Sequence, residues 1–230
     1  MKKFFEGMRD GIPIAMGYLS VSFTFGFMAV SAGMSWWQAL LISMTNLTSA
    51  GQFAGLDIMV SGGGLIEMAL TEFVINLRYA LMSLSLSQKL DRFVNTPHRF
   101  AVSFGVTDEI FAVASSRDGE VGRHYLYGLI AVPYIGWQVG TLLGALLGGI
   151  LPEMVGNALG IAIYGMFLAI IIPQAREDAA SLKVIVIAAL LSCCFHWMPV
   201  LRRLSSGFMV IICAVAASAV GAWLYPIEEK

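Results

Sequence analysis

The segment 65–86 constrains the fold most strongly, because it is an apolar run of membrane-spanning length with polar and charged side chains near its centre. Glu72, Asn76 and Arg78 lie within this otherwise apolar stretch. A charged side chain at bilayer depth costs roughly 2.5–3.5 kcal/mol on insertion scales, and it normally faces a partner charge or a water-filled cavity. We therefore expect this segment to line a path for a polar solute.

Composition assigns the whole chain to the membrane. The 230 residues are 58% hydrophobic and 13% charged, with a mean hydropathy of +0.78, whereas soluble domains carry about 25% charged residues. At ~20 residues per crossing, we predict an all-α polytopic membrane protein with about seven or eight hydrophobic helices in a single transmembrane transport domain, 1–230. The net charge of −1 and the lack of any RNA- or DNA-binding motif exclude a nucleic-acid partner. The apolar runs are 12–32, 38–60, 65–86, 101–115, 126–151, 158–173, 184–198 and 207–225.

The runs 38–60 and 101–115 are expected to be broken or re-entrant helices. The first is interrupted by Thr45 and Asn46 and then by small and polar residues at 48–52, and the second is short for a full crossing. Non-helical backbone at membrane depth is tolerated only where it is buried in protein or lines a cavity. Both segments therefore point to the same polar interior as the charged run does.

The charges in the loops favour a turn-back of the same two segments. If every run crosses the bilayer, Lys89, Arg92 and Arg99 lie outside, which opposes the positive-inside rule. If both interrupted runs turn back, these residues join the basic N-terminus on the cytoplasmic side. The alternative is eight ordinary spans with a weak charge bias.

The membrane runs contain more acids than bases. The acids are Asp57, Glu67, Glu72, Asp108 and Glu109, and the base is Arg78. One cation balances at most one acid, and burial out of water favours the protonated form of the others. We expect Asp57 and Glu67 to lie at the interface, and Glu72 to be a candidate for proton coupling or charge pairing. We expect Arg78 to pair with Asp108 or Glu109, while the other of these two acids carries a proton.

Helical spacing separates the roles of the polar residues. Glu72 and Asn76 are four residues apart and share a helix face, whereas Arg78 points elsewhere. Asn76 is thus a candidate for contacting solute. Gln52, beside Gly51, is a second candidate, because an uncharged amide can bind a polar solute without the cost of burying a charge. An equal alternative is a tight helix crossing in which Gln52 bonds to the backbone of a neighbouring helix.

Enzyme chemistry has no support in the sequence. Metalloprotease, hydrolase and phosphate-loop motifs are absent, and the cysteines have no metal-ligand spacing. We expect a protein that is not an enzyme and that uses no metal and no cofactor.

An ordered set of short motifs covers the first half of the chain. The motifs lie at 11–18 (GIPIAMGY), 25–26 (FG), 49–53 (SAGQF), 76–83 (NLRYALMS) and 107–112 (TDEIFA). No single motif is specific, but in this order and at these separations the set resembles the AzlC family of branched-chain amino-acid permeases.

The resemblance implies export of leucine, isoleucine, valine and methionine across the bacterial plasma (inner) membrane. It also implies a small AzlD-type membrane partner and the use of the proton gradient. Phe53, Tyr79 and Phe111 would then line a pocket for the apolar side chain, with core packing as an equal alternative. Two other functions stay open: an assembly or stability subunit of a transport complex, and a passive channel for a small polar solute.

Overall fold

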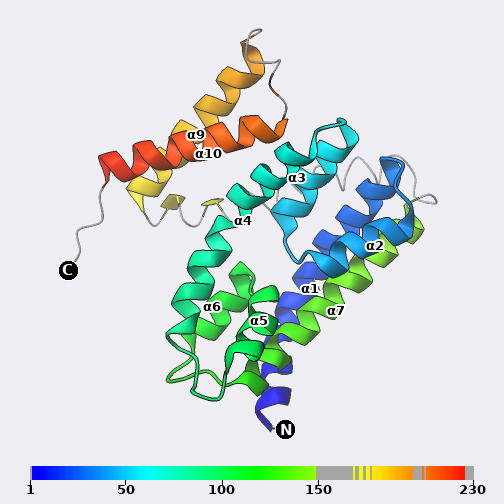
Figure 1. Cartoon of the computed structure of the whole chain (residues 1–230), viewed down its shortest axis with the longest axis vertical. Coiled ribbons are helices and arrows are strands. Elements are labelled where there is room, and N and C mark those ends of the chain that lie inside the picture. The colour runs from blue at the N-terminus through cyan, green and yellow to red at the C-terminus, as the bar shows by residue number, and fades with distance from the viewer. Residues whose placement is uncertain are drawn as a thin grey trace. The chain divides into compact units, whose positions relative to one another are not determined.

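The computed structural model describes residues 2–148, 168, 171–172, 175–176, 178–198, 204 and 206–225 (Figure 1). No strand occurs among these residues, which confirms the predicted all-α class. The helices are α1 (Lys2–Ser31), α2 (Trp36–Thr45), α3 (Ser49–Val60), α4 (Leu65–Ser87), α5 (Thr96–Phe104), α6 (Asp108–Ser116), α7 (Arg123–Leu147), α9 (Ala179–Trp197) and α10 (Ser206–Leu224).

Within the described part of the chain, four helices are long and apolar enough to cross a membrane: α1, α7, α9 and, over Gly207–Leu224, α10. Helix α4 has 23 residues but carries three charged side chains, so its length suits a crossing while its composition needs a polar environment. The predicted run 158–173 and the basic residues at 202–203 lie almost wholly or wholly outside the described residues.

Both segments predicted to be broken are broken. The first divides into α2 and α3 at residues 46–48, and the second divides into α5 and α6 at residues 105–107. The four pieces have 10, 12, 9 and 9 residues, which is about 14–18 Å each at 1.5 Å per residue. Each piece is therefore about half as long as a bilayer core of ~30 Å is thick.

The chain forms two compact units, and the boundary between them runs through α3 and α4. Unit 1 comprises Met1–Gln52 and Asn76–Gly160, and unit 2 comprises Phe53–Ile75 and Ile161–Lys230. The single transport domain expected from the sequence stays a prediction.

Helices α1 and α7 form the scaffold of unit 1 and pack side by side along their lengths (Figure 1). Glycines allow this contact: a Cβ atom at Gly26 would overlap the Thr141 carbonyl oxygen, and one at Gly144 would overlap the Phe23 carbonyl oxygen. The stripe of glycines at 140, 144 and 148 is therefore a device for close helix packing, as its four-residue spacing predicts.

In unit 2, helices α9 and α10 pack together, and Glu67 reaches the start of α10. The Glu67 carboxylate is buried and accepts a hydrogen bond from the Gly207 backbone N–H at 3.1 Å. A carboxylate is favourable at a helix N-terminus because that end carries partial positive charge. Glu67 thus has a capping role, and Asp57 is exposed, while the interfacial position expected for both stays a prediction.

Helix α9 begins with a side-chain cap. The Asp178 carboxylate accepts hydrogen bonds from the Ser181 and Ala180 backbone N–H groups at 2.8 and 3.1 Å, and from the Ser181 hydroxyl at 2.6 Å. These bonds, led by the Ser181 hydroxyl, hold the pKa of this exposed carboxyl below its ordinary value.

Candidate functional site

The two helix breaks of unit 1 are joined by one group of polar side chains, which we call the break cluster. It contains the residue before each second half-helix, two acids, a cation and two tyrosines. Its members are Tyr18, Thr48, Arg78, Tyr79, Thr107, Asp108 and Glu109.

Local sequence explains why α6 starts where it does. Gly105 ends α5, and Thr107 is the N-cap of α6, with its hydroxyl oxygen accepting from the Ile110 backbone N–H at 3.5 Å. Threonine is a good N-cap because its side chain satisfies an N–H that the helix leaves unpaired. Asp108 and Glu109 then occupy the first turn, where the helix dipole favours acids.

Arg78 forms an ion pair with Asp108. Arg78 Nη1 lies 2.5 Å from Asp108 Oδ2, and the two side chains are 40% and 34% exposed in the isolated chain. The pairing of Arg78 with one of the two adjacent acids is thus present as predicted. The pair is open enough for water or a small solute to reach it.

A second set of contacts links Arg78 to the other break. Arg78 Nη2 donates to the Tyr79 hydroxyl oxygen at 3.4 Å, and the Tyr79 hydroxyl donates to Thr48 Oγ1 at 3.5 Å. Thr48 Oγ1 also accepts from the Gly51 backbone N–H at 3.4 Å, at the start of α3. The first turns of α3 and α6 are therefore connected through two neighbouring residues of α4.

Glu109 is held by the α1 scaffold. The Tyr18 hydroxyl lies 2.6 Å from Glu109 Oε2 and 2.5 Å from Thr107 Oγ1. One hydroxyl carries one proton, so when Tyr18 donates to the Glu109 carboxylate it accepts from Thr107. The Tyr18 ring stands edge-on to the Trp137 ring, with centroids 5.2 Å apart. This contact fixes the hydroxyl against the scaffold.

Gln52 is satisfied inside the protein. Its amide group donates to the Asn46 carbonyl oxygen at 2.7 Å and to Ser43 Oγ at 3.3 Å, and its oxygen accepts from Trp137 Nε1 at 3.1 Å. The side chain is 2% exposed. These bonds across the α2–α3 break favour the helix-crossing alternative, in which Gln52 holds the break in shape.

The remaining candidates lie in different places. Asn76 is half-buried on α4, one turn before Tyr79. Phe111 packs against the hydrophobic core of unit 1, which favours its packing role. Phe53 and Glu72 are half-buried in unit 2, where a Cβ atom at Gly55 would lie 3.1 Å from Glu72 Oε1. The structure thus brings Arg78, Tyr79, Asp108 and Glu109 together.

Three members of the break cluster were missed as functional residues: Tyr18, Thr48 and Thr107. They carry no charge, so counting charges in apolar runs does not find them. Two of them stand inside the motifs that carry the family resemblance, Tyr18 at the end of 11–18 and Thr107 at the start of 107–112. Among the described residues, no group of three or more His, Cys, Asp or Glu side chains could hold a metal ion.

These features define an all-α membrane protein in which broken helices surround buried polar groups. The sequence model of the AzlC protein family matches residues 13–151, and the chain belongs to this family. Its family membership supports a transport-related role in a membrane.

Related proteins extend the similarity beyond the motifs. An uncharacterized membrane protein of Archaeoglobus fulgidus is 34% identical over 175 residues, covering 75% of this chain and 76% of that protein. The inner membrane protein YgaZ of Escherichia coli is 26% identical over 205 residues, covering 86% and 84%. No solved structure matches the chain.

Proposed function

We propose that this chain is the subunit of a secondary transporter that exports leucine, isoleucine, valine and methionine, coupled to proton entry. The observation that carries the proposal is the break cluster, in which the first turns of two half-helices share a cation and two acids. Broken helices with their ends at such a site are the common way for transporters to bind a polar solute in the membrane.

The cluster contains the groups that a zwitterionic solute needs. The N-terminal turn of α3 and the Arg78 guanidinium attract a carboxylate. Asp108 and Glu109 attract an ammonium group. Asn76 and Tyr79, on α4, are our candidates for polar contacts with the solute, and Gln52 keeps the α2–α3 break open behind them.

Asp108 and Glu109 have different roles in this proposal. Asp108 pairs with the Arg78 guanidinium at 2.5 Å, and this cation favours the charged form of the carboxyl. None of the ion pairs found among the described residues involves Glu109, and its bond to Tyr18 is available in both protonation states. Glu109 is therefore our candidate for the proton carrier, with Tyr18 as the residue that positions it.

We further propose a small AzlD-type membrane subunit as the partner and the bacterial plasma membrane as the location. The apolar surface of α9 is consistent with either lipid or a partner helix, since almost none of its apolar stretch is buried within the chain. The family resemblance supplies the identity of the partner.

Flux in membrane vesicles tests the substrate directly. Vesicles that contain the chain with its partner are loaded with labelled leucine, isoleucine, valine, methionine or, for comparison, lysine. We expect release of the first four to exceed that of lysine and to depend on this chain. Equal release of all five, or none, would contradict the substrate proposal.

The same assay separates the two rival functions. A passive channel would release leucine down its gradient with no response to a proton gradient. An assembly subunit would leave flux unchanged when Asn76 is replaced by alanine, as long as the complex still forms. We expect Asn76→Ala to reduce leucine flux while the partner still copurifies.

A further inference from the structure

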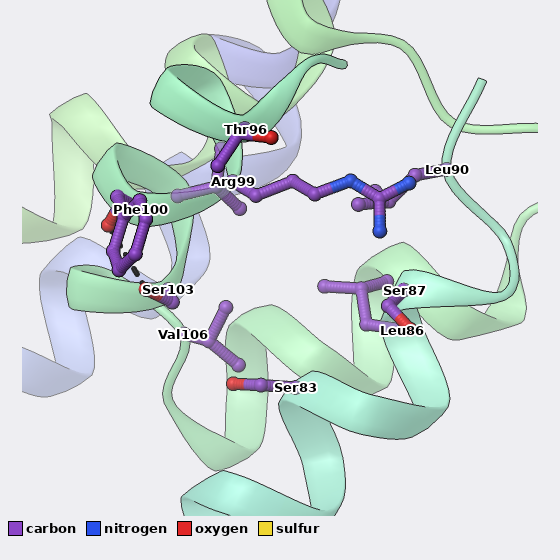
Figure 2. A pocket seen from close by; sticks show the side chains of 10 residues that line it. Ser83, Leu86, Ser87, Leu90, Thr96, Arg99, Phe100, Ser103 and Val106 are labelled. Atoms are coloured by element: carbon purple, nitrogen blue, oxygen red, sulfur yellow. Dashed lines mark hydrogen bonds between the residues drawn. The ribbon is translucent and has the colours of Figure 1, made fainter. Parts of the chain in front are cut away.

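A separate pocket of about 300 Å³ lies between the C-terminal end of α4 and helix α5 (Figure 2). Its volume is at the lower limit of small-molecule sites, which are about 300–1,000 Å³. The pocket belongs wholly to unit 1. It is lined by Ser83, Leu86, Ser87, Leu90, Thr96, Arg99, Phe100, Val102, Ser103 and Val106.

The lining combines an apolar wall with one cation. Leu86, Val102 and Val106 are buried and belong to the hydrophobic core of the unit. Figure 2 shows the Arg99 side chain extending from α5 across one side of the pocket, with Leu86 and Ser83 on the opposite side. Serine and threonine hydroxyls complete the polar part, and no lining residue is an acid.

Arg99 has donors to spare. Its Nε donates to the Val94 carbonyl oxygen at 3.1 Å, and this bond fixes the base of the guanidinium. None of the ion pairs found among the described residues involves Arg99. A guanidinium has five N–H donors in a planar fork that matches a carboxylate, so the two Nη groups can bind one.

The pocket adjoins the break cluster on two sides. Val106 lies in the α5–α6 break, next to the N-cap Thr107. On α4, Tyr79, Ser83 and Ser87 are four residues apart in succession and therefore share one face. The pocket and the break cluster therefore border the same face of α4.

We propose that this pocket binds a small carboxylate with a branched apolar tail, with Arg99 on the carboxylate and Leu86, Val102 and Val106 around the tail. As the transported solute, such a ligand would occupy the pocket before it enters the break cluster, and this role rests on the proposed function. Because the lining contains a cation and no acid, the carboxylate and the tail are recognised and the ammonium group is not.

Equilibrium binding to the full-length chain in nanodiscs of zwitterionic lipid tests the pocket apart from flux. The labelled probe is leucine, and the competitors are 4-methyl-2-oxopentanoate, which lacks the ammonium group, and 3-methylbutylamine, which lacks the carboxylate. For the part of the leucine binding that Arg99→Gln removes, we expect the oxo acid to compete about as well as leucine and the amine to fail. Competition by the amine, or failure of the oxo acid, would overturn the assignment.

Matched variants locate the binding. Arg99→Gln should weaken binding by about tenfold or more, as expected for loss of a charged hydrogen bond, whereas Arg92→Gln changes an exposed arginine outside the lining. Ser83→Leu should fill the pocket and abolish binding, whereas Ser85→Leu places the same side chain at an exposed position of α4. If the two variants of either matched pair weaken leucine binding equally, the proposal is contradicted.

The binding and flux experiments distinguish a failure of the pocket assignment from a failure of the proposed function. If leucine is exported and the Arg99 and Ser83 variants export it normally, the pocket has no role in transport and the proposed function stands. If leucine binds as described but no flux occurs in the complex, the proposed function is wrong and the pocket assignment stands.

Discussion

Arg78 and Tyr79 are neighbours in the chain, yet each reaches a different helix break. Successive residues of an α-helix project about 100° apart, so Arg78 faces Asp108 at the start of α6 while Tyr79 faces Thr48 at the start of α3. The bond between Arg78 and Tyr79 closes the connection at 3.4 Å. A solute that displaces one of these side chains therefore acts on both half-helices.

A charge exchange tests the Arg78–Asp108 pair. We expect Asp108→Arg alone and Arg78→Asp alone to lower the amount of folded protein, since each leaves like charges together. The cost should fall between the ~0–1 kcal/mol of exposed pairs and the ~3–5 kcal/mol of buried ones, because the side chains are 40% and 34% exposed. The double exchange should recover thermal stability in detergent.

The control for this exchange introduces the new aspartate at a different arginine. Arg92 is exposed, so Arg92→Asp combined with Asp108→Arg should give no recovery. If both double variants recover thermal stability equally, or neither does, the Arg78–Asp108 pair does not stabilise the fold.

Some residues of the site could be predicted from the sequence and others could not. The Arg78–Asp108 pair follows from counting charges in apolar runs. Tyr18 does not, because a tyrosine in an apolar helix is ordinary and its partner Glu109 is 91 residues away. The binding partner of Gln52 could not be predicted from the sequence, since a buried amide is equally suited to a solute or to a backbone carbonyl.

Among the elements, the α1–α7 pair fixes the geometry on which the breaks depend. Tyr18 of α1 and Trp137 of α7 meet ring to ring, and they hold Glu109 and Gln52 respectively. A change in the distance between these two helices would therefore move both contacts. The glycines in the α1–α7 contact set that distance.

Two glycine-to-alanine changes on α1 should have opposite effects. At Gly26 a Cβ atom would overlap the Thr141 carbonyl oxygen, so Gly26→Ala should lower stability by roughly 1–3 kcal/mol, as overpacking does. At Gly17 the space is open, so Gly17→Ala should be neutral or stabilise by about 0.5–1 kcal/mol through helix propensity. Thermal unfolding in detergent measures both. Equal losses of stability in the two variants would mean that Gly26 does not limit how closely α1 and α7 approach.

The helix breaks were predictable, but the helix pairing was not. Polar and small residues at 45–52 interrupt one apolar run, and the other is too short to cross. Both are local signals. A glycine stripe indicates that some helix approaches closely, and it does not identify α1 as that helix, because the partner is more than 100 residues away in the chain.

Side-specific labelling tests the predicted turn-back of the broken segments. In a chain with Cys193, Cys194 and Cys213 replaced by alanine, Gln88→Cys should react with a membrane-impermeant thiol reagent from the cytoplasmic side. Gly64→Cys, in the loop between α3 and α4, should react from outside, and its added Cβ meets open space. Reaction of Gln88→Cys from outside would mean that the segment 38–60 crosses the membrane.

At the scale of the whole molecule, the family match and the site coincide. All residues of the break cluster fall within the matched residues 13–151 and within unit 1. The cluster therefore lies in the part of the chain that the family model matches, whereas α9 and α10 lie beyond the matched range. We therefore expect the chemistry of transport in unit 1, with unit 2 available for contacts with lipid and with the proposed partner.

The most direct test of the account is the response of leucine efflux to a proton gradient in vesicles that contain the complete complex. Acidifying the outside should accelerate efflux by the native chain and by Glu120→Gln, which changes an exposed acid away from the cluster. Glu109→Gln keeps a hydrogen-bonding partner for Tyr18 but cannot exchange a proton, so it should lose this acceleration while the complex still assembles. Unchanged acceleration in Glu109→Gln would contradict the assignment of Glu109 as the proton carrier.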